Sequence, residues 1–198
     1  MDHSEVRAAW DDVAAAYANA RDPDGPDAAL IDDLLAELPP APTVLDVGCG
    51  DGARTLANLP SDAVGVDFSR AGLELATDTL SEARLAQGDM LSLPVETDSV
   101  DGITAYHAVF HVDRDHHPEV YEEFARVLRP GGWVLATLPG GRYETVRRGW
   151  MGGEMFFSTP GRETTLSELR AAGFEEIRTE TSSDPLGSST EFVFAQLG

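Results

Sequence analysis

The feature that most constrains the fold is a short apolar run that ends in three closely spaced glycines, VLDVGCGDG at 44–52. Glycine has no Cβ, so Gly48 and Gly50 permit a tight turn and allow a ligand to lie directly against the backbone. In nucleotide-binding α/β folds such a loop joins the first strand to a helix. We therefore predict a strand at 43–47, a ligand-binding loop, and a helix that the glycine turn opens.

An acidic residue strengthens the prediction of a nucleotide site. Folds of this type place an acid at the end of the second strand, about 20 residues after the first, where it binds ribose hydroxyls. Asp67 ends the apolar run 63–67, 21 residues after Asp46. The segment 48–53 also fits the dinucleotide pattern G-x-G-x-x-A, but Asp46 would then face a pyrophosphate of like charge. A ligand that carries an ammonium group fits Asp46 better.

The rest of the chain alternates short β-rich runs with helical patterns, which is typical of a parallel sheet built from βαβ units. Helices are predicted at 5–18, 27–38, 69–80 and from 117 to about 128, with Ser69 as an N-cap. The sequence shows no internal repeat, so we predict one domain over 1–198. The predicted strands are 43–47, 63–67, 84–87, 100–106, 133–138, 176–180 and 191–196.

Several ordered motifs resemble those of class I S-adenosylmethionine-dependent methyltransferases. VLDVGCGDG resembles the first motif of that family and VGVDFS the second, while GDMLSLP and SVDGITAYHAVFHV resemble the segments after strands three and four. RVLRPGGWVLATLP and LRAAGFEEI resemble the later helix, turn and strand segments. The resemblance implies a Rossmann-like α/β fold with helices on both faces of a seven-stranded, mostly parallel sheet whose last strand is antiparallel. It also implies S-adenosylmethionine as cofactor and S-adenosylhomocysteine as product.

The resemblance assigns residues to each part of this cofactor. Asp67 would bind the ribose, Phe68 would lie against the adenine, and Tyr106 would border the methionine moiety and the transferable methyl group. Asp89 and Met90 match the positions that contact the adenine amino group and its apolar edge. The positions that would hold the methionine moiety are Asp46 and the backbone of Gly48, Cys49 and Gly50. This place in the motif requires a small residue with an accessible amide, which disfavours Cys49 as a nucleophile.

A pattern near the N-terminus, W-x-x-V-A-x-x-Y-x-x-x-R, resembles the helix that closes over the cofactor in small-molecule members of the family. Tyr17 and Arg21 would then bind the methionine carboxylate, Arg21 in a bidentate manner. We accordingly predict that residues 1–40 cover the cofactor. The alternative is that Trp10, Val13 and Tyr17, which have helical spacing, form an ordinary core face.

Four histidines follow the fourth predicted strand and include the candidate general bases. Methyl transfer from a sulfonium requires alignment and exclusion of water, and a base only where the acceptor loses a proton. His111 is our first candidate and Tyr106 the second; the alternative is that these histidines cap turns or lie on the surface. His107 and His111 also have the spacing of a zinc pair, but without a third ligand we predict no metal.

The charge balance excludes several partners. The chain has 14 basic residues, all of them arginine, against 35 acidic ones, which gives a net charge of −21. Polyphosphates and anionic lipids would be repelled, the sequence contains no apolar run long enough to span a membrane, and its start lacks the features of a secretory signal. We therefore predict a soluble, cytoplasmic protein that binds neither nucleic acid nor membranes. The composition resembles that of halophiles; the alternative is an acidic protein from a GC-rich genome.

One segment departs from this acidic composition. Residues 139–162 combine four arginines with aromatic residues, methionines and glycines, so we predict an adaptable lid over the acceptor. Arg147, Arg148 and Trp150 are the candidate substrate-binding residues, for a small acceptor that is anionic or aromatic. The alternative is that the aromatic residues belong to the core and the arginines pair with surface acids.

These inferences predict a methyltransferase that transfers a methyl group from S-adenosylmethionine to a small molecule by in-line displacement. Two alternatives stay open. One is a module that binds S-adenosylmethionine or S-adenosylhomocysteine without catalysis, and the other is an NAD(P)-dependent oxidoreductase on a similar fold.

Overall fold

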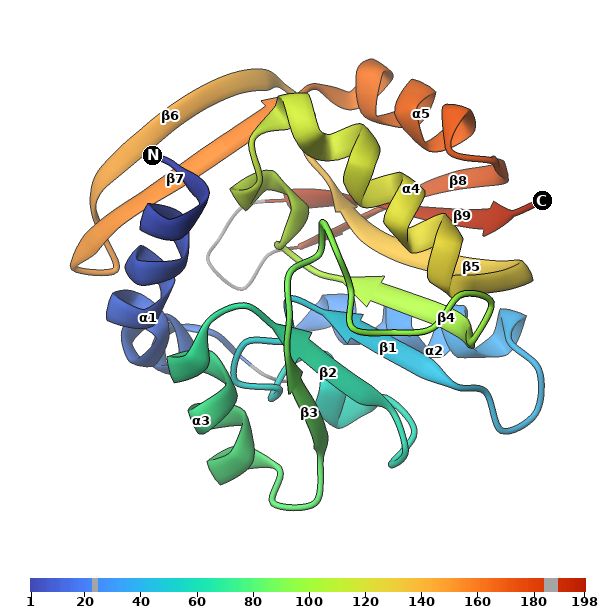
Figure 1. The fold of residues 1–198 in the computed structure, drawn as a ribbon, viewed down its shortest axis with the longest axis horizontal. Helices are drawn as coiled ribbons and strands as arrows, with labels where there is room; N and C mark the ends of the chain where they lie inside the picture. The colour runs from blue at the N-terminus through green and yellow to red at the C-terminus, as the bar shows by residue number, and fades with distance from the viewer. Residues whose placement is uncertain (23–24, 184–188) are drawn as a thin grey trace.

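A seven-stranded sheet forms the centre of the computed structural model, which describes residues 1–22, 25–183 and 189–198 (Figure 1). The strand order is β3-β2-β1-β4-β5-β9-β8. Adjacent strands from β3 to β5 pair in parallel, whereas β9 is antiparallel to both β5 and β8. The predicted mostly parallel sheet with an antiparallel last strand is confirmed. The strands are β1 (Val44–Val47), β2 (Val64–Asp67), β3 (Arg84–Gln87), β4 (Val100–Ala105), β5 (Leu128–Leu138), β8 (Phe174–Ser183) and β9 (Ser189–Leu197).

Helices cover both faces of the sheet because the central strands are apolar on both sides. Successive residues of β5 point to opposite faces: Trp133 and Leu135 pack with α2, while Val134 and Ala136 pack with α4 and α5. No helix among the described residues is both long and apolar enough to cross a membrane. The helices are α1 (His3–Ala20), α2 (Ala29–Glu37), α3 (Arg70–Thr79), α4 (His117–Val127) and α5 (Arg162–Ala171).

The predicted helix directly after the glycine loop is wrong. Residues 50–59 form turns and one short 3₁₀ helix, η2 (Leu56–Asn58). Arg54 and Thr55 turn inward, where they bind the carboxylates of Asp27 and Asp46. These side-chain bonds hold the backbone in a turn conformation that competes with a helix, and Pro60 prevents further turns of helix.

The segment 139–162 forms a β-hairpin that the sequence analysis did not predict. Its strands, β6 (Arg142–Trp150) and β7 (Gly153–Pro160), pair with each other in a separate two-stranded sheet. Figure 1 shows the hairpin arching beside α1. Met155, Phe156 and Phe157 of β7 pack against Val6 and Val13 of α1, so the hairpin holds this helix from outside.

The glycine loop gives a stability prediction. Gly48 and Gly50 both have positive φ, +74° and +54°. A Cβ at Gly48 would lie 2.5 Å from the Cβ of Ala108, whereas a Cβ at Gly50 would meet no other described atom within 4 Å. We expect Gly48→Ala to lower the free energy of unfolding by about 2–4 kcal/mol, through strain and overpacking, and Gly50→Ala by about 1 kcal/mol, through strain alone.

Urea unfolding of both variants at one fixed salt concentration measures this difference. Equal decreases in the free energy of unfolding would show that a Cβ at position 48 is not overpacked against Ala108.

Candidate active site

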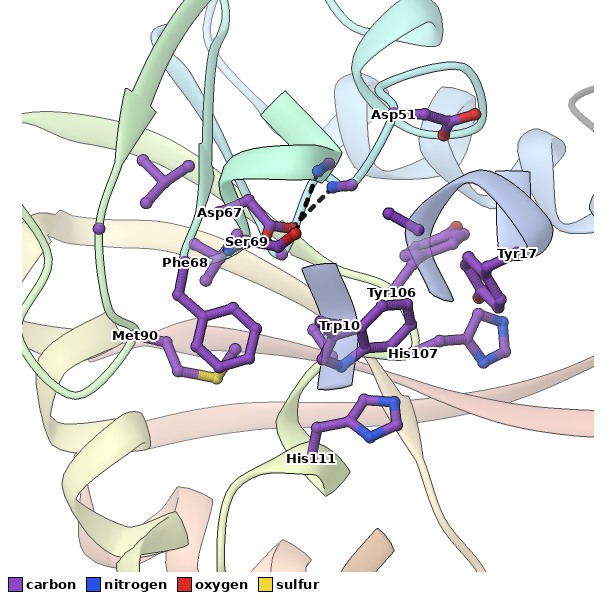
Figure 2. Close-up of a pocket in the computed structure, with 18 of the residues that line it drawn as sticks. Trp10, Tyr17, Asp51, Asp67, Phe68, Ser69, Met90, Tyr106, His107 and His111 are labelled. Atoms are coloured by element: carbon purple, nitrogen blue, oxygen red, sulfur yellow. Dashed lines mark hydrogen bonds between the residues drawn. The ribbon is translucent and has the colours of Figure 1, made fainter. Parts of the chain in front are cut away.

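A cavity opens at the carboxyl ends of the central parallel strands. It contains about 810 Å³ of empty space, including its open mouth. Its walls come from the glycine loop, the ends of β2 and β3, the segment after β4, and α1 (Figure 2). Ligands of open α/β sheets bind at this edge, where the strand order reverses between β1 and β4.

Asp67 lies at one end of this cavity. Its Oδ2 accepts a hydrogen bond from the backbone N of Gly50 and its Oδ1 one from the N of Ser69, each at 2.8 Å. Burial raises the pKa of this carboxyl to about 6, although both hydrogen bonds oppose the shift. Each oxygen can accept another hydrogen bond when the group is ionised, so the carboxylate can bind two neighbouring hydroxyls.

Phe68, Asp89 and Met90 line the same end of the cavity. Figure 2 shows Phe68 and Met90 together there. His3 joins them from the first turn of α1, with Nε2 2.6 Å from Oδ2 of Asp89 and its ring 5.7 Å from that of Phe68. This end therefore combines flat apolar surface with a polar edge, as an adenine requires.

Asp46 does not line the cavity. It is 1% exposed, and the hydroxyls of Thr55 and Thr104 donate hydrogen bonds to its carboxylate. Burial raises the pKa of this carboxyl to about 6. The structure thus places Asp46 behind the glycine loop, in contrast to the prediction that it holds the methionine moiety directly.

A second cavity adjoins the first at Gly48, Gly50 and Tyr17, and two arginines border it. One is Arg21, whose guanidinium lies 5.2 Å from the centre of the Tyr17 ring. The other is Arg54, which the sequence analysis missed. The only available signal was that Arg54 is the single basic residue between Arg21 and Arg70.

Cys49 and Tyr106 also lie at this junction. Cys49 lines the second cavity but is 5% exposed, and burial raises the pKa of its thiol well above the usual range. The hydroxyl of Tyr106 donates a hydrogen bond to the carbonyl of Asp27 at 2.9 Å, and burial raises the pKa of this phenol. Tyr106 therefore contributes wall surface to both cavities while its hydroxyl is bound in the core.

His111 lines the first cavity from η3 (Val109–His111). Its Nδ1 lies 2.8 Å from the carbonyl of Phe156, which can only accept, so Nδ1 carries the proton and Nε2 the lone pair. Burial lowers the pKa of His111 to about 4. The ring is therefore neutral near pH 7.

Trp10 joins the cavity to the aromatic cluster behind it. Its ring lies 4.9 Å from that of His111, 5.1 Å from that of Tyr17 and 5.6 Å from that of Trp150. Trp10 therefore fits both interpretations of the N-terminal pattern. It lines the cavity, as a residue of a covering helix would, and it also packs against core residues.

The three predicted substrate-binding residues lie outside the cavity walls. Trp150 packs behind Trp10. The guanidinium of Arg147 lies 4.5 Å from the centre of the Phe157 ring, and Arg148 lies 3.2 Å from Glu154 on the exposed side of the hairpin. Of the three, Trp150 packs directly against residues that line the cavity, Trp10 and Tyr17.

Comparison with known proteins assigns this architecture to a family. Residues 44–132 match the family model described as a methyltransferase domain. Indolepyruvate C-methyltransferase of Streptomyces griseus is 28% identical over 162 residues, which cover 77% of this chain and 44% of that protein. A tRNA (carboxymethyluridine(34)-5-O)-methyltransferase of Arabidopsis thaliana is 28% identical over 134 residues, 67% of this chain and 32% of that protein. The chain thus spans less than half the length of these two relatives.

A solved structure supports the same assignment at the level of the fold. The complex between the Trm112 methyltransferase activator and a methyltransferase of Haloferax volcanii matches with a TM-score of 0.74 and 19% identity, covering 98% of each chain. The ordered motifs, the strand order and the family model agree. Residues 44–132 therefore form a methyltransferase domain of the class I S-adenosylmethionine-dependent type, with S-adenosylmethionine as its cofactor.

Proposed function

We propose that the protein transfers the methyl group of S-adenosylmethionine to a small aromatic or other planar molecule. One observation carries this proposal: a continuous cavity joins an end suited to a nucleoside, at Asp67 and Phe68, to an aromatic end, at Trp10 and His111. The bound cofactor supplies an activated methyl group on a sulfonium. Arg147 and Arg148 lie outside the cavity walls, which favours an aromatic acceptor over an anionic one.

The residues present fit this cofactor. Asp67 would accept hydrogen bonds from the ribose hydroxyls. Phe68 and Met90 would cover the adenine, and Asp89 would accept a hydrogen bond from its amino group. Beside Gly50 the space that a Cβ would fill is open among the described residues, so a ligand can lie against this backbone.

The methionine end fits as well. Tyr17, Arg21 and Arg54 border the second cavity, where a guanidinium can bind the methionine carboxylate. The glycine loop would contact the same moiety through its backbone.

At the other end, Trp10 would provide a flat wall for the acceptor, and Nε2 of His111 would accept a hydrogen bond from it. We propose this role for His111 because a ring with a pKa of about 4 is neutral near pH 7 and keeps the Nε2 lone pair as an acceptor. The cover formed by α1 would exclude water, and alignment in a closed site can supply roughly 7–11 kcal/mol of the barrier.

A tRNA acceptor is the main competing possibility, since three relatives carry that activity in their names. The net charge of −21 argues against it, because polyanions bind to proteins mainly through basic residues. A non-catalytic binding module is the second alternative.

A labelling experiment distinguishes these possibilities. We expect the protein, incubated in molar potassium chloride with methyl-labelled S-adenosylmethionine, to label a small-molecule fraction of cell extract and to leave tRNA unlabelled. Label in tRNA would contradict the proposed acceptor. Tight binding of S-adenosylhomocysteine without any labelled product would favour the binding module.

The role of Asp67 gives a second prediction. Asp67→Asn should raise the dissociation constant for S-adenosylhomocysteine about 10- to 100-fold, because the ribose hydroxyls lose a charged acceptor. The ligand favours the ionised carboxylate, so in the unmodified protein affinity should fall as the pH drops below about 6, by roughly tenfold per pH unit.

Calorimetry between pH 5 and pH 8 tests both effects. Asp46→Asn is the matched control, because Asp46 has a pKa that is also raised to about 6 but lies outside the cavity. Loss of the pH dependence in Asp46→Asn, or its survival in Asp67→Asn, would refute the assignment.

The hairpin gives a third prediction. Trp150→Ala should lower kcat/KM for the labelled acceptor about tenfold, because Trp10 loses the ring that packs against it and the cavity wall becomes mobile. Arg148→Ala, on the exposed side of the same hairpin, should leave kcat/KM unchanged. Steady-state kinetics of both variants measure this difference. Equal values of kcat/KM for the two variants would contradict a specific role for Trp150.

A further inference from the structure

We infer that His107 and Asp27 form a proton-accepting pair, in which His107 takes the acceptor's proton and Asp27 stabilises the resulting imidazolium. The inference rests on the proposed function and assigns a base to it. It also narrows the acceptor to one that loses a proton on methylation: a hydroxyl, a thiol or an acidic carbon.

His107 lies where the two cavities meet. Its side chain lines both of them, together with Tyr17 and Tyr106, and Figure 2 shows the three at the same end of the site. The residue has a φ of +52°, and its backbone N donates a hydrogen bond to Thr137 Oγ1 at 2.8 Å. A positive φ is costly for a residue with a side chain, so this backbone is held by its surroundings in the conformation that brings the imidazole to the junction.

Asp27 lies behind this imidazole. It belongs to η1 (Pro26–Ala28), is 1% exposed, and has its Oδ2 4.0 Å from Nε2 of His107. This distance is longer than a hydrogen bond but short for two charges in a buried site. Its Oδ2 also pairs with Arg54, while Oδ1 is buried and has no hydrogen-bond partner among the described residues. A buried carboxylate at this distance favours a protonated imidazole beside it.

The other candidates near the aromatic end are poor bases, and His3, which pairs with Asp89, lies at the adenine end. His111 is surrounded by aromatic rings, and its pKa is lowered to about 4. The hydroxyl of Tyr106 is bound to the carbonyl of Asp27, and burial raises the pKa of the Cys49 thiol. Of the two histidines that line the first cavity beside the aromatic end, only His107 has a carboxylate behind it.

With His107 and Asp27 as the proton-accepting pair, the bonds and charges of the methyl transfer balance. The acceptor's bond to hydrogen breaks, its electron pair forms the new bond to the methyl carbon, and its proton moves to His107, while the cofactor sulfur keeps the electrons of the broken bond. One positive charge thus disappears at sulfur and one appears on the imidazole, so the net charge of the buried site does not change. Such a step avoids the cost of creating a new charge away from water.

The other charged and titratable groups near His107 are few. Arg54 faces Asp27 and is neutralised by it, and Tyr106 is adjacent in sequence. The second cavity is also lined by Tyr17 of α1, by Arg21 directly after this helix, and by Asp51 of the glycine loop. Asp27 is the carboxylate placed behind the ring.

The first test needs no acceptor and follows the imidazole of His107 by NMR as the pH is changed. In the unmodified protein its titration should lie at higher pH with S-adenosylhomocysteine bound than with S-adenosylmethionine, because the sulfonium repels an imidazolium. In Asp27→Asn the titration should move to lower pH. An unchanged titration in both comparisons would overturn the inference. Failure of S-adenosylhomocysteine to bind at all would instead refute the proposed function.

The second test uses the acceptor found by labelling. His107→Gln should slow single-turnover methyl transfer about 100-fold and leave the dissociation constant for S-adenosylhomocysteine within about threefold. The control is His116→Gln, an exposed histidine beside Glu119, which should transfer at the normal rate. A normal rate in His107→Gln would overturn the inference even if Asp27→Asn failed to fold.

Discussion

The site depends on the carboxylate of Asp67, which joins the glycine loop to the start of α3 through two backbone hydrogen bonds. Ser69 extends this network: its hydroxyl caps α3 at the N of Gly72 and donates to Asp11 of α1 at 2.7 Å. One carboxylate thereby aligns the loop, a helix and the helical cover. The same oxygens are those proposed to bind the ribose, so the group that organises this part of the fold would also recognise the ligand.

Buried acids give this end of the molecule its electrostatic character. Asp46 and Asp67 are both buried, and the pKa of each is raised to about 6, mainly by desolvation. Of the two, Asp67 lines the cavity, and its carboxylate gains stability when a cation approaches, because the cation compensates for the lost hydration. The proposed cofactor brings a sulfonium and an ammonium. The surface excess of acids, by contrast, only disfavours polyanions and says nothing about the chemistry.

The sequence predicted the elements that a local residue pattern determines. It missed the elements that depend on contacts with other parts of the chain. Strands such as β1 and β2 are apolar and end at a glycine or an acid, so pattern alone located them. The hairpin was missed because β6 is exposed and carries the charged run RYETVRRGW, while its partner packs on α1. The helix expected after the glycine loop failed for a similar reason, since Arg54 binds the carboxylate of Asp27, 27 residues earlier, and Thr55 that of Asp46, nine residues earlier.

The site residues divide in the same way. The position of Asp67 at a strand end was sufficient to place it in the cavity wall. Asp46 lies within a strand, where side chains alternate between faces, so spacing could not show that it points behind the loop. Arg54 and Asp27 are 27 residues apart in the chain, and only the folded structure brings them together under the second cavity.

The position of α1 links the two ends of the reaction site. Its first turn reaches Asp89 through His3, its centre reaches Ser69 through Asp11, and Trp10 and Tyr17 lie over the end proposed for methyl transfer. Every part of the cavity therefore borders one rigid element that the hairpin holds from outside. The wall of the adenine end and the aromatic wall therefore include residues of the same helix, so the position of α1 fixes the shape of both ends of the cavity.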